Sequence, residues 1–195
     1  VLRGGWGANA MDGGDGTDTL DYTAALAAVS VDLDNDQVLK SSDSQLDTYS
    51  DFENLLGSNF DDVFALDASS LLAIDTQFDS IDGGSNAAGG DTVEVTGSIT
   101  FDGLEMANVF DNIENIDFLG AALDGGNPTF TITGDDVSSM VGSSNFLHMD
   151  VGAAFVLDIQ AGTHVLDNPA GTVVSPGVTH YTFDAGSFTL EVQVT

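Results

Sequence analysis

The sequence predicts an all-β protein, in which a short parallel segment leads into a larger β-rich region. Three observations carry this prediction. The first 21 residues are rich in glycine and repeat with a period of nine. The rest of the chain contains many short segments in which apolar residues alternate with polar ones between turn residues. Of the 32 acidic residues, 27 are Asp and 5 are Glu, and Asp favours turns whereas Glu favours helices.

The repeat consists of two nonapeptides, GGWGANAMD over residues 4–12 and GGDGTDTLD over residues 13–21. Glycines at the first, second and fourth positions allow a positive φ at little cost. The sixth position is Asn9 in the first copy and Asp18 in the second. The second copy fits G-G-x-G-x-D-x-U-x, with U a large apolar residue, which is typical of calcium-binding β-helices. A calcium ion takes about six to eight oxygens, so we expect two adjacent turns to share each ion.

On these residues the segment resembles the RTX, or haemolysin-type calcium-binding, repeats of bacterial proteins exported by type I secretion. The resemblance implies a parallel β-roll with calcium between successive turns, held by sixth-position side chains and glycine carbonyls. The ligands it implies here are Asp18, Asn9 and the carbonyl groups of Gly5, Gly7, Gly14 and Gly16. Asn9 departs from the family pattern, since its amide oxygen carries no charge. The alternative is a glycine-rich hairpin without metal.

Two later segments resemble RTX turns less closely. Residues 52–63, FENLLGSNFDDV, are similar to a segment that often continues a β-roll. Residues 82–91, DGGSNAAGGD, form a second glycine cluster that breaks the nine-residue phase. The candidate metal ligands in these segments are Asp61, Asp62, Asp82 and Asp91. The alternative for both segments is a solvated acidic turn.

The charge balance narrows the possible partners. The formal net charge is −30, with Arg3 and Lys40 as the only basic residues. A compact body with this charge repels itself unless cations intervene, and bound divalent ions would reverse the local balance. A halophile-style acidic surface explains the charge equally well but not the glycine spacing. So negative a chain is expected to bind neither nucleic acid nor anionic membranes, and no apolar run approaches a membrane span. Without cysteine, no disulfide can stabilise it.

Local patterns predict the remaining elements. Residues 22–28 suggest one helical turn, 28–34 a half-buried strand, 41–50 a polar loop, and 67–73 a short helix capped by Asp67. Residues 91–95 predict a strand, and 135–141 a short capped helix. Five further strands are predicted at 129–133, 145–151, 155–159, 178–183 and 187–194. We expect antiparallel or β-roll-like pairing in this larger region. The predicted division is an RTX-like β-roll over 1–78 and a β-rich domain over 79–195, or one continuous unit.

No motif indicates an enzyme, because nucleophile elbows, zinc-protease helices, P-loops and dinucleotide fingerprints are all absent from the sequence. His148, His164 and His180 are evenly spaced, but separate strand and loop positions explain them better than a shared metal. The opening VLRGG has no basic or apolar leader. We therefore expect the chain to begin within a repeat array, and the resemblance implies export by a C-terminal signal.

The expected function is that of a calcium-stabilised extracellular structural or adhesive module, which folds on binding calcium after export. From residue 113 onward the chain resembles the C-terminal regions of large RTX adhesins, which implies a secreted or bacterial cell-surface location. The expected partners are calcium ions, neighbouring RTX repeats or copies of the chain, and surface glycans or proteins. The alternatives are a self-assembling surface-layer or filament subunit, a carbohydrate-binding module using Trp6, and an enzyme's accessory domain.

Overall fold

A computed structural model describes residues 1–68, 77–86, 89–99, 103–123, 130–152, 156–184 and 186–195. In this part of the chain the strands form three sheets. The smallest pairs β13 (Phe130–Thr133) with β15 (Leu157–Gln160). A five-stranded sheet contains, in spatial order, β1 (Leu2–Arg3), β3 (Thr19–Asp21), β7 (Asn54–Leu56), β9 (Ser80–Asp82) and β11 (Phe110–Asp111). All of its strand pairs are parallel.

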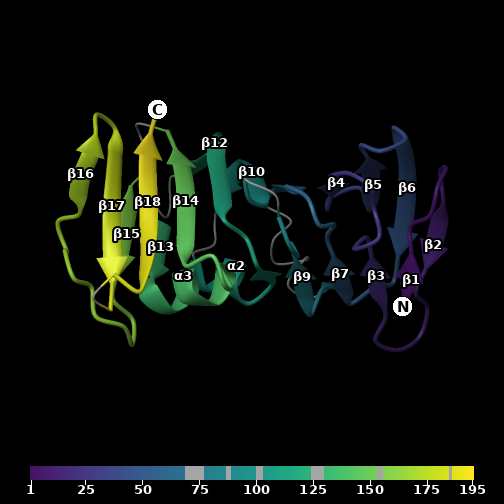
Figure 1. The fold of residues 1–195 in the computed structure, drawn as a ribbon, viewed down its shortest axis with the longest axis horizontal. Helices are drawn as coiled ribbons and strands as arrows, with labels where there is room; N and C mark the ends of the chain where they lie inside the picture. Colours follow the sequence, from purple (N-terminus) through teal and green to yellow (C-terminus); the bar gives the residue numbers. More distant parts are fainter. Residues whose placement is uncertain (69–76, 87–88, 100–102, 124–129, 153–155, 185) are drawn as a thin grey trace.

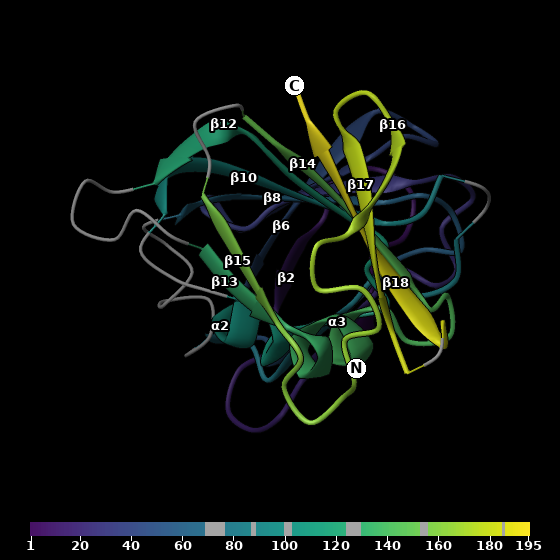
Figure 2. The same ribbon diagram turned by 90° about the vertical axis from the view of Figure 1, so that its left-hand side faces the viewer.

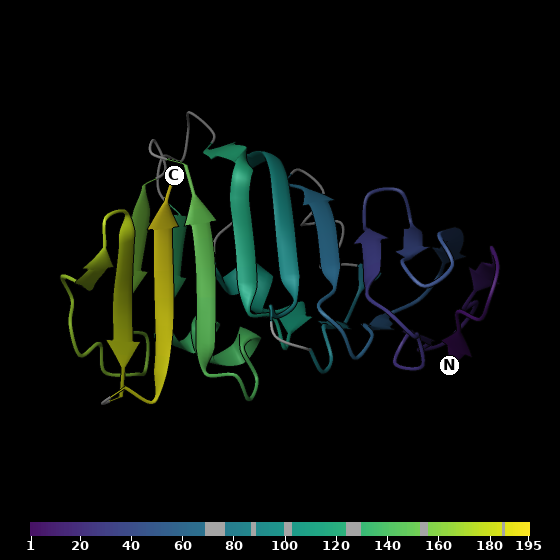
Figure 3. The ribbon, with the colours of Figure 1, turned by 45° about the horizontal axis from the view of Figure 1, so that its top comes forward.

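An eleven-stranded sheet follows the long axis of the molecule (Figures 1 and 3). Its spatial order is β16 (Thr172–Ser175), β17 (Val178–Phe183), β18 (Phe188–Val194), β14 (Phe146–Val151), β12 (Asn115–Leu123), β10 (Thr92–Ile99), β8 (Val63–Asp67), β4 (Val29–Asp32), β5 (Gln37–Lys40), β6 (Gln45–Ser50) and β2 (Ala10–Asp12). The antiparallel pairs are β4–β5, β5–β6, β16–β17 and β17–β18. The other neighbours in this sheet are parallel.

The central part of the chain coils. It passes from β3 to β4, then through β7, β8, β9, β10, β11 and β12, adding strands to the two larger sheets in turn. Such parallel neighbours require long crossover connections, and the passage through the other sheet supplies them. Viewed along the long axis, the strands surround a common interior (Figure 2). The central coils form a β-solenoid of parallel strands within mixed sheets, since β5 and β6 near the N-terminal end and β16 and β17 near the C-terminal end pair antiparallel with their neighbours.

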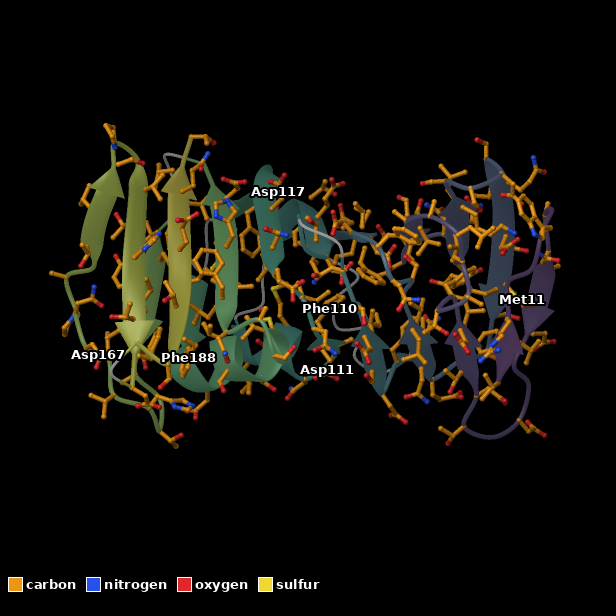
Figure 4. The ribbon with its side chains drawn as sticks, viewed as in Figure 1. Met11, Phe110, Asp111, Asp117, Asp167 and Phe188 are labelled. Atoms are coloured by element: carbon orange, nitrogen blue, oxygen red, sulfur yellow. The ribbon has the colours of Figure 1, made fainter. Side chains whose placement is uncertain are left out.

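Matching apolar residues fill the interior of successive coils. In the large sheet one inward-facing level consists of the register-matched residues Val31, Phe64, Val93, Ile116, Met149 and Val192. In the five-stranded sheet the corresponding level consists of Leu20, Leu55, Ile81 and Phe110. All of these side chains are buried, and the buried cluster includes Met11 and Phe188, which lie toward opposite ends of the molecule in Figure 4. A slip of one residue would turn a whole level toward solvent, so burial fixes the register.

Close contact at the corners between the sheets requires glycine. A Cβ atom on Gly57 would lie 2.3 Å from the carbonyl oxygen of Gly83 in the next coil. A Cβ atom on Gly83 would lie 2.4 Å from the carbonyl oxygen of Asn112, one coil further on. Neither position has room for a side chain, so glycine allows the coils to stack at this corner.

The N-terminal coil has the length of two nonapeptides. Leu2 of β1 pairs with Leu20 of β3, eighteen residues later, and β2 lies between them in the sequence. Strand β2 joins the large sheet, where Ala10 pairs in parallel with Thr48 of β6. The hairpin of β5 and β6 therefore lies between β2 and β4. This insertion brings a second set of polar residues against the first glycine turn.

Most of the local predictions are confirmed. The described chain is mostly strand, as the all-β prediction requires. Residues 28–34 contain β4, whose side chains alternate between buried and half-buried. Residues 91–95 fall in β10, and the five later predictions correspond to β13, β14, β15, β17 and β18. Helix α3 (Gly134–Met140) forms with a capping box between Thr133 and Asp136.

Other predictions differ from the structure. Residues 22–28 form turns and bends rather than a helical turn. The predicted loop at 41–50 is wrong, because it contains β6. The inward positions of that strand are Asp47 and Tyr49, so an acid occupies a site where the apolar pattern would have revealed a strand. Pairing is mixed rather than mainly antiparallel. The helix predicted at 67–73 lies mostly outside the described residues.

Helix α2 (Gly103–Ala107) was not predicted from the sequence. No helix in the described ranges is long and apolar enough to cross a membrane. Strands from both sides of residue 78 belong to the same eleven-stranded sheet.

The interior levels predict a large effect of truncation. Changing Phe64 to Ala removes a fully buried ring and is expected to lower the free energy of unfolding by about 3–5 kcal/mol. Phe60→Ala is the matched control, because that ring is 37% exposed. Urea unfolding followed by circular dichroism measures both variants. Equal losses in the two would contradict the assignment of Phe64 to the core.

Candidate cation-binding turns

The first glycine turn already surrounds a positive charge. Lys40 on β5 is 3% exposed, and its Nζ donates to the carbonyl oxygens of Gly5 (2.6 Å) and Gly7 (2.5 Å). It also donates to Oδ1 of Asp47 on β6 at 2.8 Å. The structure thus brings together the two carbonyls that the sequence predicts as ligands. The group that they share is an ammonium.

Asp47 links this turn to its surroundings. It is fully buried, its Oδ1 accepts from the backbone N–H of Asn9 (2.8 Å), and its Oδ2 accepts from the hydroxyl of Tyr22 (2.9 Å). Burial, together with the charge and hydrogen bond of Asp47, raises the pKa of Tyr22 far above its ordinary value. The side-chain amide nitrogen of Asn9 donates to Gly7 O (3.1 Å) and to Asp47 Oδ1 (2.9 Å). Asn9 therefore presents a donor, not an oxygen, to this cluster.

The second glycine turn repeats the arrangement nine residues later. Gly14 has a φ of 77°, close to the 80° of Gly7. The backbone N–H of Asp18 donates to Oε2 of Glu53 at 2.7 Å, as that of Asn9 does to Asp47. Within the described ranges no hydrogen bond reaches the carbonyl oxygen of Gly14 or Gly16.

No basic side chain serves this second turn. Lys40 belongs to the first turn, and Arg3 pairs with Asp21 at 2.7 Å. The amino group of Val1 lies 3.6 Å from Oδ1 of Asp18. Asp18 and Glu53 are both only partly buried. The donor set is therefore two carboxylates and two available carbonyls, which are the oxygen ligands that calcium prefers.

The later candidates divide into two groups. Asp62 and Asp91 lie side by side on successive coils, where the N–H of Asp62 donates to Asp91 Oδ1 at 2.7 Å. Asp61 instead accepts from the N–H groups of Gly89 and Gly90, at 3.0 and 3.2 Å. Asp82 accepts from the N–H of Gly84 (2.9 Å) and from the amide of Asn112 (2.7 Å). Asp61 and Asp82 thus hold loop backbone and a corner amide.

Asp62, Asp91 and Glu114 form a carboxylate ladder, each standing directly before a strand of the large sheet. Asp62 Oδ1 accepts from the N–H of Val29 at 2.7 Å, and Glu114 Oε2 accepts from the N–H of Asp91 at 3.0 Å. Asp91 is fully buried, and its Oδ2 accepts no hydrogen bond from the described residues. The sequence did not single out Glu53, Asp47 or Glu114. Register was the missing information, since each lies next to a predicted residue only across coils.

Burial sets the protonation of the ladder. Burial first, and the charges of Asp62 and Glu114 after it, raise the pKa of Asp91 to about 7 against the opposing hydrogen bond from the Asp62 N–H. Burial also raises the pKa of Asp62 and of Glu114.

In the described part of the chain no group of three or more His, Asp or Glu side chains is arranged to hold a metal ion. Any ion in the glycine turns would depend on carbonyl oxygens for many of its ligands.

Two of the three histidines share one carboxylate. His148 and His180 contact opposite oxygens of Glu191, His148 through Nδ1 at 2.7 Å. His164 pairs instead with Asp184, at 2.6 Å. The three imidazoles therefore do not share a single carboxylate partner.

Comparisons with known proteins add no family to this description. No protein-family model matches the chain, and no curated protein matches it.

The ladder predicts a pH dependence of stability. Because the pKa of Asp91 is raised from 3.8 to about 7, the folded protein holds this proton more tightly than the unfolded chain. The resulting stabilisation is complete below pH 3.8 and is lost as the pH rises through about 7. We expect the decrease in unfolding free energy between pH 5 and pH 8 to be smaller in Asp91→Asn, by roughly 1–3 kcal/mol.

Urea unfolding at pH 5, 6, 7 and 8, in the presence of EGTA, measures this difference. The control variant is Asp79→Asn, since that side chain is exposed. An Asp91→Asn profile parallel to those of the wild type and the control would show that Asp91 does not bind the extra proton.

Proposed function

We propose that this chain is a calcium-stabilised structural or adhesive module of a secreted bacterial protein of the RTX type. Its calcium ion would lie in the second glycine turn, with Asp18, Glu53 and the carbonyl groups of Gly14 and Gly16 as ligands. When bound, the ion would supply positive charge within a turn that neither Lys40 nor Arg3 reaches. The module is proposed to act outside the cell, where it would hold an elongated solenoid in its folded form.

The observation that carries the proposal is the arrangement around Lys40. In the first turn, two glycine carbonyls and a neighbouring acid gather around a cation. The second turn has glycines at the same spacing and an acid that accepts the equivalent backbone N–H. It replaces Asn9 with Asp18 and has no lysine. The same framework, with an acid in place of Asn9 and no lysine, is suited to a free divalent ion.

The coil length supports the same proposal. The eighteen-residue offset between Leu2 and Leu20 equals two nonapeptides, and one glycine turn lies at either end of β2. The net charge of −30 supports a requirement for cations.

Calcium would act through mass action. An ion that binds only the folded state stabilises it by an amount that grows with ion concentration. Extracellular calcium modules have dissociation constants of about 10⁻⁴–10⁻³ M. A site in this range would be largely empty inside a bacterial cell and filled outside it. Folding would then be favoured after export.

A calcium titration with a matched variant tests this proposal. At 10 mM calcium, a site of that affinity would raise the unfolding free energy of the wild type by about 1.4–2.7 kcal/mol. Asp18→Asn should lose most of this increase, because it gives the second turn the uncharged residue of the first. Asp158→Asn, which changes an exposed acid on β15, should keep it. Urea unfolding in EGTA and in calcium measures each variant.

Two results would count against the proposal. One is a wild-type stability that is unchanged by calcium. The other is an equal response in Asp18→Asn and in the wild type, which would place the ion elsewhere.

A further inference from the structure

The only lysine of the chain is one of its most deeply buried charged groups. A protein with 32 acidic residues offers many exposed partners for a lysine. Lys40 instead lies inside the first coil with 3% of its side chain exposed, beside the fully buried Asp47. Lysine is almost never buried this completely unless it is paired. This position therefore requires a specific explanation.

The surroundings of the ammonium match its chemistry. An ammonium has three N–H donors. Lys40 Nζ has three oxygen acceptors, namely the carbonyls of Gly5 and Gly7 and the carboxylate of Asp47. Every donor is thus satisfied by an oxygen of the kind that also binds hard metal ions.

We propose that the Lys40 ammonium is a tethered substitute for a metal ion, and that the oxygens around it form a cation site able to bind calcium when the lysine is absent. The first turn would then fold without metal, whereas the second would require it. This inference deepens the proposed function and rests on it only for the second turn.

The charges of the two turns support this division. The buried part of the first turn combines one carboxylate, that of Asp47, with one ammonium, and Asn9 is neutral. The second turn has two carboxylates, those of Asp18 and Glu53, and neither basic side chain of the protein reaches it. The partly buried Asp43 also accepts from the backbone N–H of Gly7 in the first turn, and the exposed amino group of Val1 lies 3.6 Å from Asp18 in the second. A buried ammonium thus lies within the first turn, whereas the second has only a terminal amine beside it and could take a divalent cation. The change from Asn9 to Asp18 thus accompanies the loss of the lysine.

The hairpin of β5 and β6 places the Lys40 ammonium in the first turn. Lys40 pairs with Gln45 across this hairpin, and Asp47 follows on the same strand as Gln45. β6 then lies along β2 with Thr48 opposite Ala10, which sets Asp47 beside Asn9. Close approach is possible because residue 4 is glycine, since a Cβ atom there would lie 2.7 Å from Asp47 Oδ2. One insertion therefore supplies both the cation and its carboxylate.

Two substitutions of Lys40 separate a cation site from an ordinary buried ion pair. Lys40→Ala removes the ammonium and leaves space for an ion, whereas Lys40→Met removes the charge but keeps a long side chain in the cavity. In EGTA both variants should unfold at a lower urea concentration than the wild type. In 10 mM calcium, Lys40→Ala should recover most of its lost midpoint, and Lys40→Met should recover none of it beyond the wild-type response.

Isothermal titration with calcium chloride counts the ions directly. Lys40→Ala should bind one more calcium ion per chain than the wild type. The double variant Lys40→Ala/Asp18→Asn should still bind one calcium ion at the first turn. The single variant Asp18→Asn should bind no calcium there. If the wild type binds calcium but Lys40→Ala binds no additional ion, the inference is overturned and the proposed function is left intact. Calcium binding by Lys40→Ala but not by the wild type would support the inference and count against the proposed site in the second turn.

Hydrogen exchange on the wild type tests the same division without any substitution. In EGTA the amide of Asn9, which donates to Asp47, should already be protected, and calcium should change its exchange rate less than twofold. The amide of Asp18 should gain at least tenfold protection when calcium is added. An equal response of both amides to calcium would show that the first turn also depends on metal, and would overturn the inference.

Discussion

At several strand starts of this protein a backbone N–H faces a neighbouring coil or hairpin, and a carboxylate there accepts its hydrogen bond. This interaction is present in five places among the described residues, in both larger sheets. The donor and acceptor pairs are Asn9 with Asp47, Asp18 with Glu53, Val29 with Asp62, Asp62 with Asp91, and Asp91 with Glu114. An unpaired buried N–H would cost about as much as a lost hydrogen bond. The acids at strand starts are therefore part of the stacking.

The interaction concentrates negative charge along the solenoid. Carboxylates of adjacent coils stand one strand spacing apart, and such like charges disfavour each other's ionised forms. The chain meets this difficulty in different ways at different positions. At Asp91 burial and neighbouring charge favour the protonated acid. At Asp47 a lysine is present. At Asp18 and Glu53 the described residues supply no basic side chain, and the proposed calcium ion would take that role.

The sequence predicted those parts of the fold in which local pattern and burial agree. The alternation of Val29 and Val31 marked β4, and similar alternation marked the strands near the C-terminus. It failed at β6, where Asp47 occupies an inward position and conceals the strand. The RTX resemblance implied that the carbonyls of Gly5 and Gly7 are cation ligands, and both accept from the Lys40 ammonium. The partners of that position, Lys40 and Asp47, come from a hairpin some thirty residues later, and only the pairing of β6 with β2 reveals them.

The Lys40–Asp47 pair also has a role beyond its net contribution to the free energy of folding. A buried ion pair often contributes little to stability compared with apolar residues of the same shape, because both charges lose their hydration. Removing one partner, however, leaves the other charge unpaired, and that is costly. A slip of one residue in β6 would turn Asp47 away from Lys40 and expose this cost. The pair therefore disfavours a register of β6 in which Asp47 would face away from Lys40 and from the N–H of Asn9.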